Sequence, residues 1–250
     1  MRLLILGASD SEGTLLADYS DSWRELLRNE LPALIGQPVE VLHRRLYVHT
    51  PNAMDYLDRC LTETTPDFVI FGTTAFMMST PSVGNRLRRR FGTRAGDWFE
   101  RRFAWFDEFT AANEGSFRER VNLRAHSLAG KTIGRDSAID YDSLLALYQA
   151  AVDRIARDES IDAILMGTTY NGPVIQKRLP HMRAEVDRFN AAIKAMANAR
   201  RYGWVDRQAV ISSLPDVTNR PDQMHNGAEV HRAYADALKP LIVERARLGR

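Results

Sequence analysis

Short apolar runs alternate along the chain with stretches whose apolar residues recur every three or four positions. The runs predict buried strands, and the longer spacing predicts helices that bury one face. Five strands are expected, at Arg2–Leu6, Val39–Leu42, Asp67–Phe71, Ile161–Met166 and Tyr202–Val205. Strands that alternate with helices in this way favour an α/β fold, with a five-stranded parallel sheet covered by helices on both faces.

The helices are marked by apolar spacing and by helix breakers. Apolar positions from Trp23 to Leu31 predict a helix that Pro32 is expected to stop. Longer helices are expected at Ile139–Ile155 and Arg183–Arg200, and Pro51-Asn52 should open another.

The last helix has a capping signal at its start. Asn226 can cap it, and Glu229 lies three residues later, as in a capping box. Val230, Tyr234 and Leu238 then form an apolar stripe that indicates a buried face.

Residues 77–137 interrupt this rhythm, because about sixty residues separate the third strand from the next crossover helix. The segment is rich in arginine and in aromatic residues. We interpret residues 1–250 as one domain with a helical insertion at about 77–137. Because it starts at the expected active-site edge, a lid is one hypothesis. The alternative is an aromatic helix packed on the sheet with a solvated basic face.

Composition narrows the class of protein. The chain has 250 residues, 44% of them apolar, with a net charge of +2 and one cysteine, Cys60. No apolar run approaches the roughly 18 residues that span a bilayer, and the N-terminal run is too short for a signal peptide. We expect a soluble, cytoplasmic protein without an integral membrane segment. The near-balanced charge argues against a nucleic-acid partner.

Candidate chemistry lies at the two ends of the chain. Residues 3–13, LLILGASDSEG, predict a buried strand that runs into a tight turn carrying Ser9. Residues 221–227, PDQMHNG, place Asp222 three residues before His225. A serine hydroxyl becomes a useful nucleophile when a histidine takes its proton and an acid orients that histidine. These residues therefore suggest a serine hydrolase or an acyltransferase.

The two segments resemble the SGNH (GDSL-like) hydrolase family. Its first motif, Gly-Asp-Ser followed by three residues and then a Gly, is similar to Gly7-Ala8-Ser9 and Gly13, with alanine in place of the aspartate. Its last motif, Asp-x-x-His before a helix, is similar to Asp222–His225. The third motif, Gly-x-Asn-Asp, appears as Gly72-Thr73-Thr74-Ala75, and the glycine of the second motif has no clear counterpart.

The resemblance implies a flavodoxin-like, three-layer fold and assigns roles to residues. Ser9 would be the nucleophile, His225 its base and Asp222 the acid that holds the base. The remaining oxyanion or substrate contacts are expected among Gly72, Thr73, Thr74, Asn171 and His49, with Thr74 or Asn171 completing the oxyanion hole. The substrate would be a small-molecule or lipid-like acyl ester, and no metal or organic cofactor is implied.

Several alternatives stay open beside this interpretation. An acyltransferase, or a non-catalytic binding protein, could use the same fold. Ser11 competes with Ser9, although Ser11 is expected to bond backbone in the turn. A dinucleotide-binding dehydrogenase is disfavoured because no G-x-G-x-x-G exists, and a metal hydrolase because no ligand spacing appears. The remaining histidines, which are interpreted as structural or exposed, are His43, His126, His181 and His231.

Overall fold

The protein is described by a computed structural model. It covers residues 1–14, 16–73, 78, 81–99, 101, 136–137, 139–170, 176, 181–215 and 225–247. For five of these residues, only the backbone is described: Ser9, Asp10, Pro81, Asp136 and Ser137.

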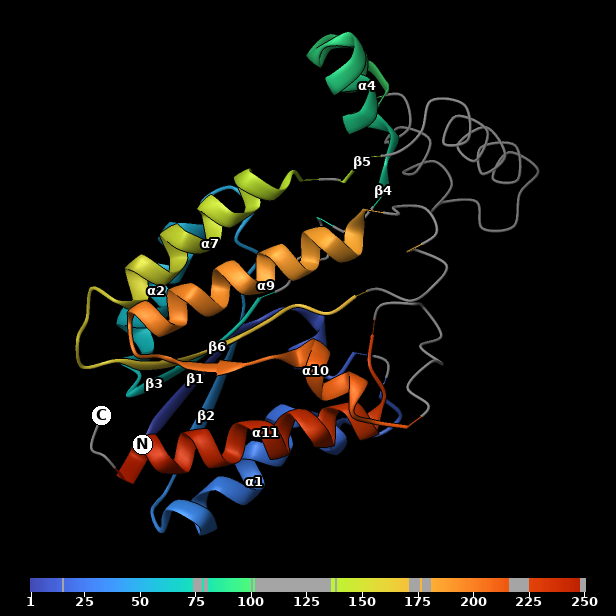
Figure 1. The fold of residues 1–250 in the computed structure, drawn as a ribbon. Coiled ribbons are helices and arrows are strands. Elements are labelled where there is room, and N and C mark those ends of the chain that lie inside the picture. Colours follow the sequence, from blue (N-terminus) through green and yellow to red (C-terminus); the bar gives the residue numbers. More distant parts are fainter. Residues whose placement is uncertain are drawn as a thin grey trace.

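The centre of the fold is a five-stranded sheet in which every pair of neighbours is parallel (Figure 1). Its strands are β1 (Arg2–Gly7), β2 (Glu40–Arg45), β3 (Phe68–Gly72), β6 (Asp162–Met166) and β7 (Gly203–Val205). Their order across the sheet is β2-β1-β3-β6-β7. This is the flavodoxin-like order, and it differs from that of the classical dinucleotide-binding fold. The predicted fold class is confirmed.

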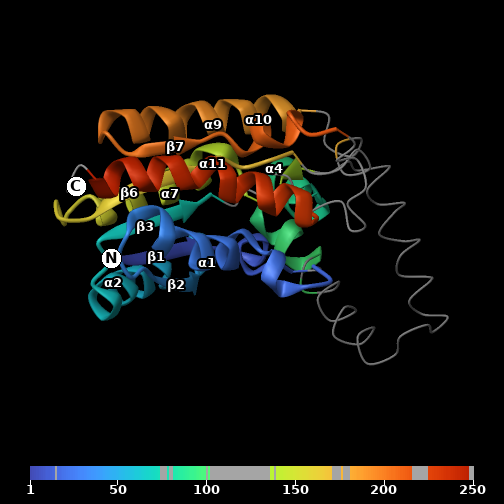
Figure 2. The same ribbon diagram turned by 90° about the horizontal axis from the view of Figure 1, so that it is seen from below.

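Helices cover both faces of the sheet. Side chains of each strand alternate between the two faces, so each face has an apolar core that helices bury. Leu4, Leu6 and Val69 belong to the core under α2 (Ala53–Thr64), α7 (Tyr141–Ile155) and α9 (Met182–Ala199). Leu3, Ile5 and Ile70 belong to the core under α1 (Trp23–Ile35), α10 (Arg207–Ser212) and α11 (Ala228–Arg247). Figure 1 shows the three layers edge-on, and Figure 2 looks onto the sheet from the side of α1 and α11, with its strands side by side.

The first helix runs past the proline that was expected to end it. Helix α1 continues through Pro32 to Ile35 and ends at Gly36, whose φ of 77° is left-handed. Proline lacks an N–H, but its carbonyl can still accept a bond, and here it accepts one from the Gly36 N–H at 2.9 Å. The prediction that Pro32 stops the helix is therefore wrong by one turn.

The last helix begins one residue later than a cap at Asn226 would place it. Helix α11 starts at Ala228, and the Gly227 carbonyl accepts the first bonds, from the N–H groups of Val230 and His231. Gly227, rather than Asn226, therefore occupies the entry of the helix. The buried stripe is as predicted, because Val230, Tyr234 and Leu238 are each at most 1% exposed.

The inserted region is described only in part. After β3, a short ribbon pairs β4 (Pro81–Ser82) with β5 (Asp136–Ser137), and α4 (Val83–Phe91) follows β4. Residues 93–99 are also helical. Most of the predicted insertion, including residues 102–135, lies outside the described residues, and its lid role stays a prediction. Among the described helices, none is long and apolar enough to cross a membrane.

Candidate active site

The candidate site lies at the carboxyl edge of the sheet. In open parallel sheets, ligands bind beyond this edge, at the strands where the winding direction reverses. Here the reversal lies between β1 and β3, which neighbour each other in the middle of the order. Ser9 follows the end of β1, and Thr73 follows the end of β3. The topology therefore brings two of the predicted motifs to the reversal point.

The turn after β1 depends on its two glycines. Ser9–Glu12 form a 3₁₀ turn, η1, immediately after the strand. A Cβ added at Gly7 would lie 2.5 Å from the Ser11 Oγ, so a larger residue there would collide with the turn. Gly13 has φ of 72°, and a Cβ added there would lie 2.8 Å from the Cβ of Ser22. The glycine spacing that the sequence shares with the SGNH motif thus has a steric cause in this chain.

Ser11 is bonded inside this turn. Its Oγ donates to the Ala8 carbonyl at 2.6 Å and lies 2.8 Å from Nε2 of His43. Because the only hydroxyl proton goes to Ala8, the imidazole is the donor in the second bond. Ser11 is also only 5% exposed. The expectation that Ser11 bonds backbone in the turn is confirmed.

His43 reaches the turn because β2 is longer than predicted. The strand extends to Arg45, and its parallel register places His43 opposite Ile5. Burial, together with the nearby Arg24 guanidinium, lowers the pKa of His43 to about 4. His43 is therefore neutral at pH 7, and its one ring proton lies on Nε2, which donates to Ser11. No local motif marks this contact, because Ser11 and His43 are distant in the chain.

An ion pair closes the outer side of the same network. Arg45 donates to both carboxylate oxygens of Glu12, with 2.8 Å from Nε to Oε1. The hydrogen bond from Arg45 lowers the pKa of Glu12. Glu12 Oε1 also lies 4.0 Å from Nδ1 of His43. The serine turn is thus tied to β2 at two points, one buried and one at the surface.

The start of α11 is hydrogen-bonded to the start of α1, which lies next to the serine turn. The Trp23 N–H, next to Ser22 in the chain, donates to Nδ1 of His231 at 3.3 Å. His231 is fully buried and lies in the first turns of α11. Since Gly13 packs on Ser22, the contacts lead from the serine turn through the start of α1 to α11. Figure 1 shows the same arrangement, with the end of β1 and the start of α11 on one side of the molecule.

His225, the predicted base, precedes α11 and is partly buried. Burial, and then the nearby Arg207 and His225, lower the pKa of His231 to about 4. The side chain of Ser9 and the whole of Asp222 lie outside the described residues. The predicted triad is therefore represented by the backbone of Ser9 and by His225.

Gly72 and Thr73 lie beside the serine turn. A Cβ added at Gly72 would contact the Leu6 carbonyl oxygen at 3.6 Å and the Gly7 Cα at 3.9 Å. Thr73 is fully buried, and both its N–H, at 3.1 Å, and its hydroxyl donate to the Met166 carbonyl. In this conformation Thr73 holds β3 against β6, and its donors are used by the backbone. Thr74, the next predicted donor, lies outside the described residues.

The loop after β6 is held by two amide side chains. Asn190 accepts from the Thr168 N–H at 2.8 Å and donates to the Thr168 carbonyl at 2.9 Å. Gln208 accepts from the Tyr170 N–H at 2.9 Å, and the Tyr170 hydroxyl donates to Asp187. Burial and Asp187 raise the pKa of Tyr170 to about 12. These bonds fix the segment that leads to Asn171, which itself lies outside the described residues.

Sequence reasoning overlooked the part that Asn190 and Gln208 play in holding this loop. Both belong to helices that follow later in the chain, and no local motif marks them.

His49 lies in the loop between β2 and α2, on the carboxyl side of the sheet. Its ring is 5.8 Å from that of Tyr47, and partial burial lowers the pKa of His49. The neighbouring Leu46 N–H donates to the Gly7 carbonyl at 2.8 Å. This loop therefore starts beside the serine turn, as the predicted substrate-contacting role of His49 requires.

Two cavities lie at different edges of the sheet. A cavity of about 440 Å³ is lined by Tyr170, Asp187 and Gln208 among others, at the carboxyl ends of β6 and β7. A larger one, of about 690 Å³, is lined by Asp67, Arg154 and Ile161 among others. Asp67 and Ile161 precede β3 and β6, so the larger cavity lies at the amino edge, opposite the candidate site.

Comparisons with known proteins address the fold. No family model matches the sequence, and no curated protein matches it. Among solved structures, TesA matches with 15% identity and a TM-score of 0.58, over 97% of this chain and 98% of TesA. The acetylxylan esterase Axe2 from Geobacillus stearothermophilus matches with 15% identity and a TM-score of 0.55, over 96% and 93%. A candidate acylhydrolase from Bacteroides fragilis matches with 14% identity and a TM-score of 0.52, over 100% and 88%.

These neighbours share the SGNH-hydrolase architecture, and this chain has the same three-layer fold. In three of the Axe2 structures, a catalytic residue has been replaced by alanine. The three residues are a serine near the start of that chain, an aspartate, and a histidine three positions after the aspartate.

Proposed function

We propose that this protein is a serine hydrolase that cleaves acyl esters, with Ser9 as nucleophile, His225 as base and Asp222 as the acid that orients His225. One observation carries the proposal: the end of β1 and the entry of α11 lie at the same edge of the sheet (Figure 1). This arrangement supports a shared site for residues 9 and 225, although most of the chain separates them. The catalytic residues of Axe2 support the assignment, because Asp222 and His225 have the same spacing as its aspartate and histidine.

The proposed reaction passes through an acyl-enzyme. His225 takes the Ser9 hydroxyl proton while the serine oxygen attacks the ester carbonyl carbon. The tetrahedral intermediate collapses, the C–O bond to the alcohol breaks, and His225 returns the proton to the leaving alkoxide. A water molecule, deprotonated by His225, then releases the carboxylic acid and restores Ser9.

The oxyanion formed during each step needs hydrogen-bond donors that are already in place. The Ser9 N–H is the first proposed donor, since it begins the turn that Gly7 and Gly13 allow. Thr74 and Asn171 are the proposed side-chain donors. Both directly follow residues that are firmly held, Thr73 by Met166 and Tyr170 by Gln208.

Covalent labelling tests the nucleophile directly. A fluorophosphonate probe, followed by intact mass, should add one adduct to the wild-type protein and none to Ser9→Ala. Ser11→Ala is the matched control, because it removes the same group two residues away and should still be labelled. A folded wild-type protein that takes no label would favour a non-catalytic binding protein, and labelling that persists in Ser9→Ala would reject Ser9.

The acyl acceptor separates hydrolysis from acyl transfer. With an activated ester as donor, a hydrolase should release free acid at a rate that added alcohols leave largely unchanged. Product that is mostly a new ester would identify the protein as an acyltransferase and leave the Ser9 chemistry intact.

A further inference from the structure

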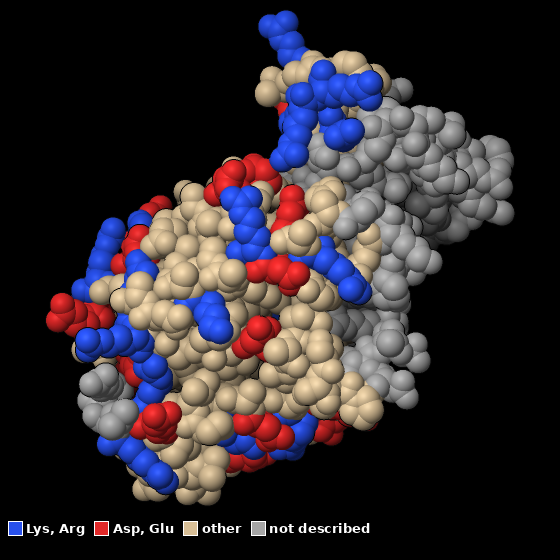
Figure 3. All heavy atoms as spheres, viewed as in Figure 1, with Lys and Arg blue, Asp and Glu red and all other residues tan. Residues whose placement is uncertain are grey.

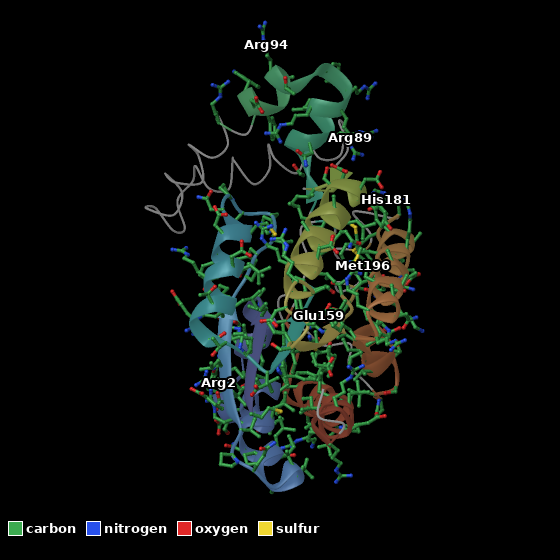
Figure 4. The ribbon with its side chains drawn as sticks, turned by 90° about the vertical axis from the view of Figure 1, so that its left-hand side faces the viewer. Arg2, Arg89, Arg94, Glu159, His181 and Met196 are labelled. Atoms are coloured by element: carbon green, nitrogen blue, oxygen red, sulfur yellow. The ribbon has the colours of Figure 1, made fainter. Side chains whose placement is uncertain are left out.

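A basic projection stands off the body of the protein. It consists of α4 and the helical residues 93–99, and is called here the arginine–aromatic tip. Figure 1 shows α4 beyond the layers of the fold, on the side of α7 and α9. In Figure 4, Arg94 lies at the outermost point of this projection and points away from the body, with Arg89 below it.

The two helical segments of the tip pack against each other. The chain turns at Gly92, where φ is 86°. The two helical segments then approach so closely that a Cβ added at Gly96 would lie 2.7 Å from the Gly84 carbonyl oxygen. Arg88 links the segments, donating to Asp97 at 3.0 Å and to Asn85 at 2.6 Å. Arg88 therefore serves the tip's own structure.

Three of the other four arginines of the tip face solvent. Arg89, Arg90 and Arg94 are exposed, and the Arg90 guanidinium lies 5.6 Å from the centre of the Phe91 ring. Residues 83–99 contain five arginines and one acid, Asp97, for a net charge of +4. The whole chain carries +2, so the remaining residues carry −2. Figure 3 shows the contrast, with basic side chains gathered on the tip and both signs mixed on the body.

Large aromatic side chains are exposed among these arginines. Phe91 and Trp98 are each 63% exposed, more than any other large apolar side chain in the described part of the protein. Aromatic rings beside arginines are typical of protein segments that lie in the headgroup region of a membrane. Anionic headgroups attract the cations, and the rings enter the boundary between headgroups and acyl chains.

We infer that the arginine–aromatic tip binds the surface of a lipid bilayer that contains anionic phospholipids. The shape of the tip favours this partner over nucleic acid. Single-stranded nucleic acid is usually held along a groove lined with basic and aromatic side chains, whereas the tip projects from the body (Figure 1). A projection of this kind can reach a flat, extended surface. The inference does not depend on the proposed ester chemistry.

Vesicle co-sedimentation of the full chain tests the inference. The wild-type protein should bind phosphatidylcholine vesicles that contain phosphatidylglycerol much more tightly than vesicles of phosphatidylcholine alone. The triple variant Arg89→Gln, Arg90→Gln, Arg94→Gln should bind the anionic vesicles about 100-fold more weakly, at about fivefold for each arginine. The double variant Phe91→Ala, Trp98→Ala should also bind weakly, and its deficit should persist at high salt, which screens only the charges.

The matched control removes three exposed arginines from the body, through Arg59→Gln, Arg157→Gln and Arg247→Gln. It changes the net charge equally and should alter binding by less than about threefold. Near-ultraviolet circular dichroism confirms that each variant is folded. The inference is overturned if the wild-type protein ignores anionic vesicles, or if the control weakens as much as the tip variant. It is also overturned if single-stranded DNA binds the tip and vesicles do not. Every one of these readings is independent of ester hydrolysis.

Discussion

Two serine–histidine pairs can be drawn around the turn that follows β1, one observed and one proposed. In the inner pair, Ser11 is buried, gives its proton to the Ala8 carbonyl, and accepts from His43, whose pKa is about 4. In the proposed pair, Ser9 begins the turn and His225 precedes α11 at the same edge of the sheet. A short serine–histidine distance alone therefore does not mark a catalytic pair. The serine proton must be available, and the histidine must be able to accept it near neutral pH.

The largest expected difference between the pairs is in the rate of reaction. His225→Ala should lower kcat/KM for a short-chain p-nitrophenyl ester by at least about 10³-fold, because the nucleophile loses its base. His43→Gln should stay within about tenfold of wild type, because the glutamine amide can still donate to Ser11. Steady-state kinetics at pH 7.5 measure both. If the two effects were exchanged, the inner pair would be the catalytic one.

The next largest expected effect is a loss of unfolding free energy at low pH. His43 and His231 both have a pKa of about 4 in the folded protein, below their ordinary value. Protons therefore bind the unfolded chain more tightly between about pH 6.5 and 4, and stability falls as the pH falls through that range. Each histidine should account for about 2 kcal/mol of lost stability at pH 5.

Urea unfolding at pH 7.5 and pH 5 measures this loss. His43→Gln removes one of the two groups, so its loss should be about 2 kcal/mol smaller than that of the wild-type protein. An equal loss in both proteins would mean that folding does not change the pKa of His43.

The smallest effect tests how tightly the turn is packed. Gly7→Ala brings a methyl group against Ser11 and should cost about 1–3 kcal/mol of unfolding free energy, as overpacking does. Ser11→Gly removes the colliding atoms but also the bonds to Ala8 and His43. The double variant should therefore be more stable than the sum of the two single losses predicts. Additive losses would show that Gly7 and Ser11 do not compete for the same space.

The sequence predicted the strands and their parallel arrangement well, because buried parallel strands are short apolar runs between helices. The predicted ends of helices and strands were less accurate where a general sequence rule has a local exception. Pro32 keeps its acceptor and lies in the last turn of α1, so the helix continues. Strand β2 includes His43, Arg44 and Arg45, which no apolar pattern marks, because its register with β1 sets its length.

The site could be predicted only where a motif is local. Glycines at 7 and 13 bracket the turn in sequence, and the structure gives both a steric reason. Thr73 looked like a possible substrate contact from its place after β3. Its donors both go to Met166, a residue far along the chain, and only the pairing of β3 with β6 reveals this. The hydrogen bond between Ser11 and His43 could not be predicted for the same reason.

The contact between Trp23 and His231 has a consequence for synthesis. The amide of residue 23 emerges early from the ribosome, and its imidazole acceptor more than two hundred positions later. Until α11 is synthesised, the apolar face of α1 stays exposed, because α11 forms much of the helix layer that buries it. Contacts between residues that are far apart in the chain form late, and apolar surface stays exposed until they form. A nascent or truncated chain should therefore depend on chaperones until the final helix docks.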